Sequence, residues 1–335
     1  MKLYNDEFKR AYKAYKAIKG AEFILIDGKV LVKNEEVEVK FRVGSFSKEP
    51  VVIDSETLKL MSRVHDDFVI TPTEIRTETK RIEYAASSAT ESLCVRDDSY
   101  VVAEISQKGL LACIKGVKFA VSTGDTTTTP VVHKNILWEE GKFVATDGYR
   151  IAIKHAPVCT ETELLIPPIA FNVLEKLLDK KSKSWVLISV GNEEMIFDFG
   201  SVSIITKRPT GEFLKYESVF TDEYEMECEV DRKLFLEKIK YLQQDKETKI
   251  CVDVTVNKLS LMSKTPNNTL TDEIEINSLR GNELSINFNS KYLIESLKNI
   301  PDDKITLTFV GRSLSPLIIK HSWGKDLILP VNIRG

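Results

Sequence analysis

The stretch FVATDGYRIAIKHAP, residues 143–157, carries the strongest signal in the chain. It predicts a strand that enters a tight turn at Asp147 and the glycine after it, followed by a second strand that begins near Ile151. An Asp-Gly turn alone is weak evidence for any function. Tyr149 and Arg150, directly after the turn, are harder to explain as plain core packing. We therefore take this turn as a candidate binding site.

On either side of this segment, the chain contains six stretches that are typical of helices. Their starts lie about 50 to 65 residues apart, and segments with a strand–turn–strand pattern separate them. One example is FILIDGKVLV, residues 23–32, which turns at an Asp-Gly pair. The predicted helices run from Asn5 (a plausible N-cap) to Lys19, from Ser55 to Val64, after Ser106 through Val117, from Pro167 through Leu178, after Asp231 through Leu242, and after Asn289 through Leu297.

The repeated unit predicts an α+β fold in which one helix is followed by a run of antiparallel strands, six times over. Pairs of units then form three domains, which we place at residues 1–97, 98–222 and 223–335. Periodicity alone leaves one alternative open, namely three unrelated α+β domains whose helices happen to be evenly spaced.

The composition is that of a globular protein, with 42% hydrophobic and 29% charged residues. No apolar run approaches the roughly 18 residues of a membrane span, and the charged N-terminus does not resemble a signal peptide. The five cysteines are scattered without a CxxC pair, which favours reduced thiols over disulfides or a zinc site. We expect a cytoplasmic protein.

The sequence contains no motif that is typical of an enzyme. Its four histidines are dispersed, and the HExxH, GxSxG, Walker-type and GxGxxG patterns do not occur. Asp147 beside Arg150 has no third group at a catalytic spacing. We therefore expect no catalytic residue, no metal site and no cofactor.

Most of the predicted helices carry lysines opposite an apolar stripe. For any single lysine, solubility is the simpler explanation. Six such helices on one surface would instead hold nucleic acid through salt-sensitive contacts that ignore base sequence, even though the net charge is only −3. The candidates for facing DNA are Lys9, Arg10, Lys13, Lys16, Lys108, Lys115, Lys118, Lys233, Lys240 and Lys298.

Residues 146–152, TDGYRIA, match the ATDG-[HY]-R-[LI]-A signature of bacterial sliding clamps, the beta subunits of DNA polymerase III. Three further segments resemble this family: residues 206–220, 286–300 and 327–335. The resemblance covers about residues 100 to 335 and is only topological over 1–97. The chain is thus identified as a divergent member of the sliding-clamp family.

The resemblance implies a DNA-clamp fold of three similar domains, with two chains joined head to tail into a homodimeric ring around double-stranded DNA. It also implies a processivity factor without chemistry of its own. The implied partners are the replicative DNA polymerase, the clamp loader and other proteins with a clamp-binding motif. At the end of the fifth helix, Leu242 and its neighbours are candidates for the contact with the second chain.

The resemblance further implies a hydrophobic groove between the second and third domains that takes a short glutamine–aliphatic–aromatic peptide. Plain core packing is the alternative for each aliphatic member. The groove residues carried over from the family are Thr146, Gly148, Tyr149, Arg150, Ile151, Val219, Asn289, Tyr292, Leu314, Leu327, Ile328, Leu329, Pro330 and Val331.

The chain departs from the family pattern at several places. Leu214 stands where the family has proline, and Asn332 stands where it usually has arginine. The first domain is also shorter than in the family. The shorter first domain leaves a second interpretation open, a clamp-like adaptor that binds peptides without closing around DNA.

Overall fold

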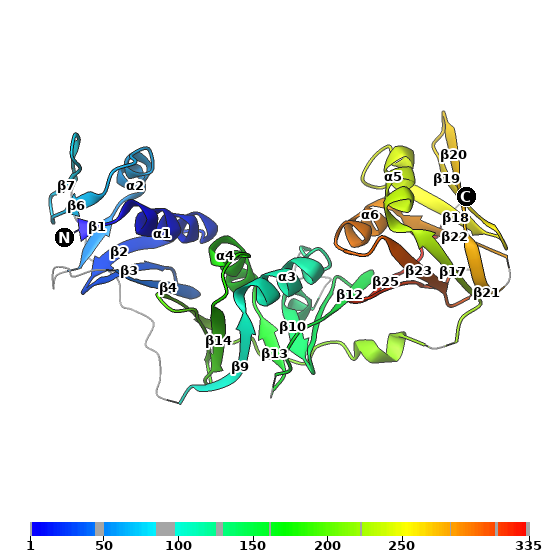
Figure 1. Cartoon of the computed structure of the whole chain (residues 1–335), viewed down its shortest axis with the longest axis horizontal. Helices are drawn as coiled ribbons and strands as arrows, with labels where there is room; N and C mark the ends of the chain where they lie inside the picture. The colour runs from blue at the N-terminus through cyan, green and yellow to red at the C-terminus, as the bar shows by residue number, and fades with distance from the viewer. Residues whose placement is uncertain are drawn as a thin grey trace. The chain divides into compact units, whose positions relative to one another are not determined.

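The computed structural model describes residues 2–43, 50–84, 98–124, 130–160, 162–221, 223–281, 283–311 and 314–332. The chain forms two compact units (Figure 1), the first made of Met1–Ala112 with Pro157–Thr210 and the second of Cys113–Ala156 with Gly211–Gly335. All six predicted helices are present, and antiparallel strands separate them. The predicted domain boundaries at 97 and 222 fall on residues outside the described part, so the division into three domains stays a prediction.

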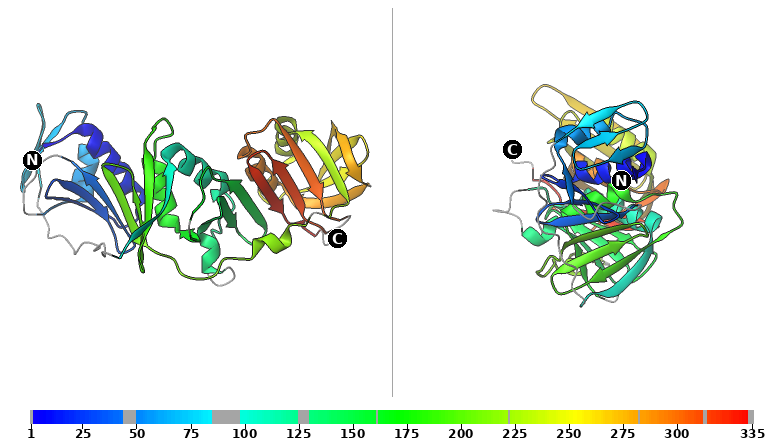
Figure 2. Two further views of the ribbon diagram at one scale, coloured as in Figure 1. Left: turned by 60° about the horizontal axis from the view of Figure 1, so that its bottom comes forward. Right: turned by 90° about the vertical axis from the view of Figure 1, so that its left-hand side faces the viewer.

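In the described part of the first unit, antiparallel strands form two sheets, in the orders β5-β2-β3-β4-β16-β15-β14-β9 and β1-β6-β7-β8. Helix α1 packs against β3 and β4, as Figure 2 shows for the dark blue segments. Phe8 of α1 contacts the rings of Phe23 and Phe68 in the core. The helices of this unit are α1 (Asn5–Ala17), α2 (Ser55–Met61) and α4 (Pro168–Leu177), while α3 (Gln107–Lys118) begins in it. Its strands are β1 (Lys2–Leu3), β2 (Glu22–Ile26), β3 (Lys29–Lys33), β4 (Val37–Arg42), β5 (Val51–Ile53), β6 (Phe68–Ile70), β7 (Glu74–Arg76), β8 (Arg81–Glu83), β9 (Tyr100–Ser106), β13 (Leu164–Ile166), β14 (Trp185–Val190), β15 (Glu194–Asp198) and β16 (Val202–Lys207).

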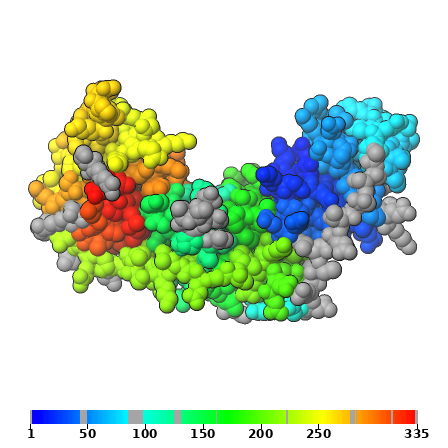
Figure 3. All heavy atoms as spheres, turned by 180° about the vertical axis from the view of Figure 1, so that it is seen from behind, coloured from blue at the N-terminus to red at the C-terminus, as the bar shows by residue number. Residues whose placement is uncertain are grey.

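In the second unit, antiparallel strands run in the orders β10-β11-β12-β25-β24-β23-β17-β21 and β20-β19-β18-β22. The space-filling view shows the C-terminal segment, in red, at the surface of this unit (Figure 3). Its helices are α5 (Arg232–Leu242) and α6 (Ser290–Lys298), with short 3₁₀ turns η1 (Val131–Lys134) and η2 (Tyr216–Val219). Its strands are β10 (Ile136–Glu139), β11 (Lys142–Thr146), β12 (Arg150–His155), β17 (Met226–Asp231), β18 (Lys249–Val254), β19 (Lys258–Lys264), β20 (Thr269–Glu275), β21 (Asn277–Gly281), β22 (Leu284–Asn289), β23 (Lys304–Phe309), β24 (Leu317–His321) and β25 (Gly324–Ile328).

Side-chain caps explain why three of the helices begin where the sequence predicts. The carboxylate of Asp54 accepts hydrogen bonds from the first backbone amides of α2, Asp231 does the same for α5, and Asn289 for α6. The prediction that Asn5 caps α1 is wrong. Asn5 is the first helical residue and is buried, and its amide Nδ2 donates to the carbonyls of Val64 and Asp66. Its side chain thus joins α1 to the segment after α2.

The prediction that Leu242 contacts a second chain also needs correction. Leu242 is fully buried in the hydrophobic core of its own unit, together with Phe235 and Ile239. A side chain enclosed in this way offers no surface to a partner. Its neighbour Tyr241 is 65% exposed.

In the described ranges, no helix combines the length and the apolar character needed to cross a lipid bilayer.

Replacing Gly116 of α3 with alanine is expected to destabilise the second unit, although alanine is the better helix former. The added Cβ would lie 2.6 Å from the Trp323 ring, which is held by a hydrogen bond of 2.9 Å from its Nε1 to the carbonyl of His155. Crowding of this kind costs about 1–3 kcal/mol, measurable as a lower urea midpoint of unfolding. In a Trp323→Leu background the same substitution should cost less, because only the contact with Lys154 Cγ at 3.0 Å remains, and an equal loss in both backgrounds would contradict the clash.

Candidate functional site

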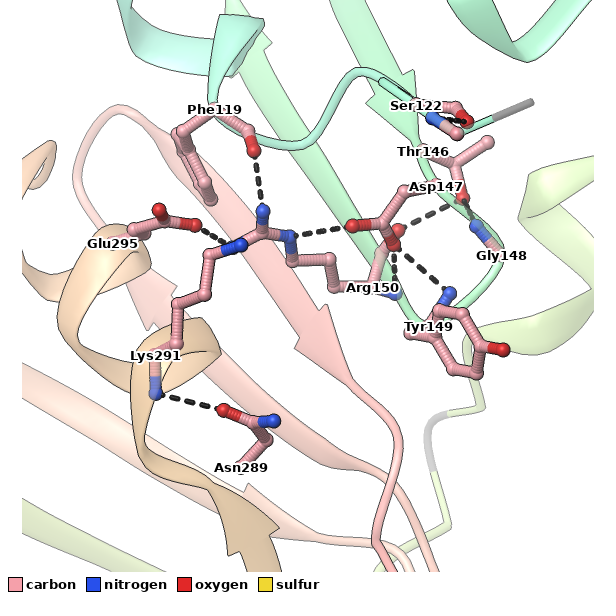
Figure 4. A network of polar contacts seen from close by, with 11 residues as sticks. Phe119, Ser122, Thr146, Asp147, Gly148, Tyr149, Arg150, Asn289, Lys291 and Glu295 are labelled. Atoms are coloured by element: carbon pink, nitrogen blue, oxygen red, sulfur yellow. Dashed lines mark hydrogen bonds and ion pairs between the residues drawn. The ribbon is translucent and has the colours of Figure 1, made fainter. Parts of the chain in front are cut away.

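The turn between β11 and β12 is held by its own side chains (Figure 4). Thr146 Oγ1 donates to the carbonyl of Arg150 at 2.8 Å and accepts from the amide of Gly148 at 3.1 Å. Asp147 Oδ1 accepts from the amides of Tyr149 at 3.0 Å and of Arg150 at 3.1 Å. Gly148 has a φ of +87°, a backbone conformation that other residues rarely adopt. The sequence TDGYR therefore specifies one rigid turn.

Arg150 is the polar centre of this site. Its side chain is 5% exposed, and each of its three guanidinium nitrogens has a partner. Nε donates to Asp147 Oδ2 at 3.0 Å, Nη1 to Glu295 Oε2 at 2.6 Å, and Nη2 to the carbonyl of Phe119 at 2.5 Å. The guanidinium also lies 4.5 Å from the centre of the Tyr292 ring, a favourable cation–π distance. We call this set of contacts the Arg150 clasp, and it joins the turn to α6 and to the end of α3.

An exposed aromatic pair lies beside the clasp. Tyr149 is 61% exposed, and its ring stacks on that of Tyr292 at a centroid distance of 6.2 Å. The segment that follows β25 runs along the turn, because the amide of Leu329 donates to the carbonyl of Tyr149 at 2.9 Å. Leu329 itself is 37% exposed. Aromatic and aliphatic side chains thus meet at the surface beside a network of buried charges.

The fourteen predicted groove residues divide by exposure. Gly148, Tyr149, Val219, Leu314 and Leu329 are exposed, whereas Asn289, Tyr292, Pro330 and Val331 are half-buried. Thr146, Arg150 and Ile151 are buried within the turn and its strands. For Leu327 and Ile328 the alternative of core packing holds, because both side chains are enclosed and Ile328 belongs to the hydrophobic core. Whether the exposed members bind a peptide stays a prediction.

A second buried charge network lies further along the same strands, and we did not predict it. The Lys154 ammonium is fully buried and pairs with Asp326, which also accepts a hydrogen bond of 2.5 Å from Ser296 Oγ. His321 Nε2 lies 2.9 Å from the same ammonium. Little in the sequence indicated it, because Lys154 stands near the end of β12 on the face opposite Ile151 and Ile153, which a strand of alternating exposure places in solvent.

Burial sets the protonation of this network. It lowers the pKa of Lys154 and raises the pKa of Asp326, and the pairing of the two groups opposes both shifts. Burial and the neighbouring charge of Lys154 lower the pKa of His321 to about 3, so this imidazole is neutral at physiological pH.

The predicted DNA-facing residues all lie on helices. Arg10 and Lys118 are half-buried and the other eight are exposed. Lys233 forms an ion pair of 2.7 Å with Asp303. Across the described ranges, no three histidine, cysteine or acidic side chains converge as the ligands of a metal ion would.

Comparison with known proteins decides the family. Residues 104–215 match the family described as "DNA polymerase III beta subunit, central domain", and residues 217–330 match "DNA polymerase III beta subunit, C-terminal domain". The chain belongs to the DNA polymerase III beta-subunit family. The beta sliding clamp of Staphylococcus aureus is 28% identical over 250 residues, which cover 70% of this chain and 64% of that relative. The clamp of Staphylococcus epidermidis is 26% identical over 249 residues.

Solved beta subunits share the fold over almost the whole chain. The Thermotoga maritima beta subunit has a TM-score of 0.86 at 19% identity, with 99% of both chains covered. The Bartonella birtlesii clamp, solved with griselimycin bound, has a TM-score of 0.86 at 18% identity, again over 99% of both chains. The predicted α+β clamp fold is therefore confirmed, including the region of residues 1–97 where the sequence resemblance is weakest.

Breaking the Lys154–Asp326 pair from one side is expected to destabilise the protein strongly. Lys154→Met leaves the Asp326 carboxylate buried without its partner, which costs about 3–5 kcal/mol in the free energy of unfolding. The double variant Lys154→Met/Asp326→Leu should recover most of that loss in urea unfolding, because two apolar side chains need no counter-charge. A double variant as unstable as the sum of both single variants would contradict this account.

Proposed function

We propose that the protein is a sliding clamp, which encircles duplex DNA as a ring of two copies and tethers the replicative DNA polymerase to it. The observation that carries the proposal is the match of two consecutive segments to the central and C-terminal domains of the DNA polymerase III beta subunit. We further propose three clamp domains at residues 1–97, 98–222 and 223–335. The protein has no catalytic activity in this proposal and works in the cytoplasm.

Two edge strands support closure of the ring. Strand β20 is the outer strand of its sheet in the second unit, and β8 is the outer strand of its sheet in the first. Edge strands present unpaired backbone groups that can pair with another chain. The charges of these strands are largely paired within the chain, since Asp272 pairs with Lys238, Glu273 with Lys258, and Arg76 and Arg81 with Glu74. We propose that β20 of one copy meets β8 of the other, head to tail, through backbone hydrogen bonds.

DNA would be held by point charges rather than by base recognition. The ten helix-borne lysines and arginines predicted from the sequence offer contacts to backbone phosphates, and such contacts are independent of base sequence. The net charge of −3 agrees with a weak, salt-sensitive interaction of the kind that permits sliding.

The surface beside the Arg150 clasp would bind the partner proteins. Tyr149 and Leu329 offer exposed apolar area, and the clasp fixes the turn from which Tyr149 projects. A short peptide that places aliphatic and aromatic side chains here would bury that area. We propose that the polymerase, the clamp loader and other proteins use a common motif of this type.

The ring is tested by its dependence on DNA topology. Loaded on a nicked circular duplex, the protein is expected to stay bound at high salt, because a closed ring is linked to the circle rather than held by charge. Cutting the circle should release it, as measured by gel filtration of the labelled protein with DNA. Retention that ignores cutting would indicate ordinary electrostatic binding instead.

Sedimentation separates the ring from the adaptor. A homodimer is expected at micromolar concentration. A chain that stays monomeric at its mass of 38.0 kDa would favour a clamp-like adaptor that does not encircle DNA.

The peptide site is tested with a QLxLF-type peptide. Tyr149→Ala is expected to weaken binding about tenfold, because it removes exposed aromatic area without touching the core. Arg150→Lys should also weaken binding, since lysine cannot donate to three partners in the fixed geometry of a guanidinium. Tyr241→Ala, a comparably exposed tyrosine of the same unit, is the matched control. Fluorescence anisotropy measures affinity, and unchanged affinity in both test variants would place the site elsewhere.

A further inference from the structure

The segment that leads into β17, residues 211–221 and 223–225, is anchored to the second unit by aromatic side chains, and we call it the connector. Four of these side chains are buried or half-buried, namely Phe213, Tyr216, Phe220 and Tyr224. The aliphatic residues Leu214 and Val219 of the same segment are exposed instead. The aromatic rings thus attach the connector to the protein, and Val219 is left at the surface.

The connector lies against the face of the sheet that points away from α6. In the register of β12 with β25, Ile153 lies opposite Lys325, and side chains paired in this way share one face of the sheet. Arg150 belongs to the other face of β12, where it pairs with Glu295 of α6. Since Lys325 contacts Phe220 of the connector, the connector and α6 lie on opposite faces.

Two lysines of neighbouring strands hold aromatic rings of the connector. The Lys325 ammonium of β25 lies 4.0 Å from the centre of the Phe220 ring, and that of Lys320 of β24 lies 4.9 Å from the centre of the Tyr224 ring. Both distances are within the range of cation–π attraction. Lys320 and Lys325 lie opposite each other in the register of β24 with β25, so both contacts are made on the same face.

Val219 is the last residue of η2, and this short turn is held on both sides of it. Before Val219, Glu217 forms an ion pair of 3.0 Å with Lys142 of β11. After it, the amide of Phe220 donates to the carbonyl of Glu217 at 3.1 Å. The Glu217 side chain is 69% exposed, and ion pairs in solvent contribute little. Lys325 and Phe220 are both half-buried, so their contact carries more of the anchoring.

We propose that Lys325 is a positioning residue for peptide binding, because its ammonium holds the Phe220 ring and thereby keeps Val219 in place as an apolar contact for the peptide. The antiparallel pairing continues past β25, where the amide of Leu329 donates to the carbonyl of Tyr149. Lys325 and Leu329 are four residues apart on one face, a distance of about 13 Å in extended chain. A short extended peptide that contacts Leu329 can therefore also reach Val219. This role rests on the proposed peptide site.

The test is a cycle of variants of the full chain, with a QLxLF-type peptide as the probe and fluorescence anisotropy as the measurement. Val219→Ala is expected to weaken binding about fivefold, because it removes apolar area from the contact. Lys325→Met keeps a long side chain without its charge and should weaken binding on the order of threefold. Lys325→Arg should retain the affinity of the wild type, since a guanidinium also binds an aromatic face. In a Val219→Ala background, Lys325→Met should have no further effect, because it acts through Val219.

Lys304→Met is the matched control, since Lys304 belongs to the same sheet and pairs with Glu229 rather than with the connector. Equal weakening in this control would overturn the role of Lys325 and leave the peptide site intact. So would an effect of Lys325→Met that is undiminished in the Val219→Ala background. Phe220→Leu removes the ring from the other side of the contact and should weaken binding as Lys325→Met does.

Amide hydrogen exchange of residues 215–220 in the free protein tests the anchoring without a peptide. Exchange is expected to be faster in Lys325→Met than in the wild type and in Lys304→Met, because the turn opens more often. Unchanged exchange would overturn the anchoring even if the wild-type chain binds the peptide. A wild-type chain that does not bind the peptide would refute the proposed peptide site and, with it, the positioning role.

Discussion

The buried guanidinium of Arg150 is the interaction on which the proposed binding surface depends. A charge removed from water is tolerated only when its donors are matched, and three segments far apart in sequence supply the acceptors. Asp147 belongs to the turn itself, Glu295 to α6, and the carbonyl of Phe119 to the end of α3. Because unpairing any one of them is costly, the turn that presents Tyr149 keeps a fixed relation to α6.

The second buried charge network, formed by Lys154, Asp326 and Ser296, lies further along the same strands. Side chains four residues apart on a strand share a face, so Arg150 and Lys154 both project from one side of β12. Asp326 lies opposite Ala152 in the register of β12 with β25, on that same side. Ser296 of α6 completes the network. A row of paired charges, which we call the seam, thus lies between α6 and the sheet. Apolar residues could pack there in many ways, whereas ionic groups are satisfied in only a few arrangements. We regard this seam as a source of specificity more than of stability.

Charge acts differently at the surface of the protein. The clasp is fully paired, whereas Lys9, Lys13 and Lys16 of α1 are exposed to solvent. Paired charges fix a structure, and exposed cations attract anions from outside.

The family, the α+β class and the places of all six helices could be predicted from the sequence, because caps, prolines and the TDGYR turn act over a few residues. Asp54, Asp231 and Asn289 could be assigned as caps for that reason. It also marked Arg150 as a residue that core packing does not explain. Only the tertiary structure decided that Glu295 and Phe119 complete the clasp, that Lys154 is buried against Asp326, and that Leu242, Leu327 and Ile328 lie inside the protein. The contacts of Arg150 with Phe119 and Glu295 span 31 and 145 residues, and that of Lys154 with Asp326 spans 172. A local pattern of apolar and charged side chains does not specify which distant groups will meet.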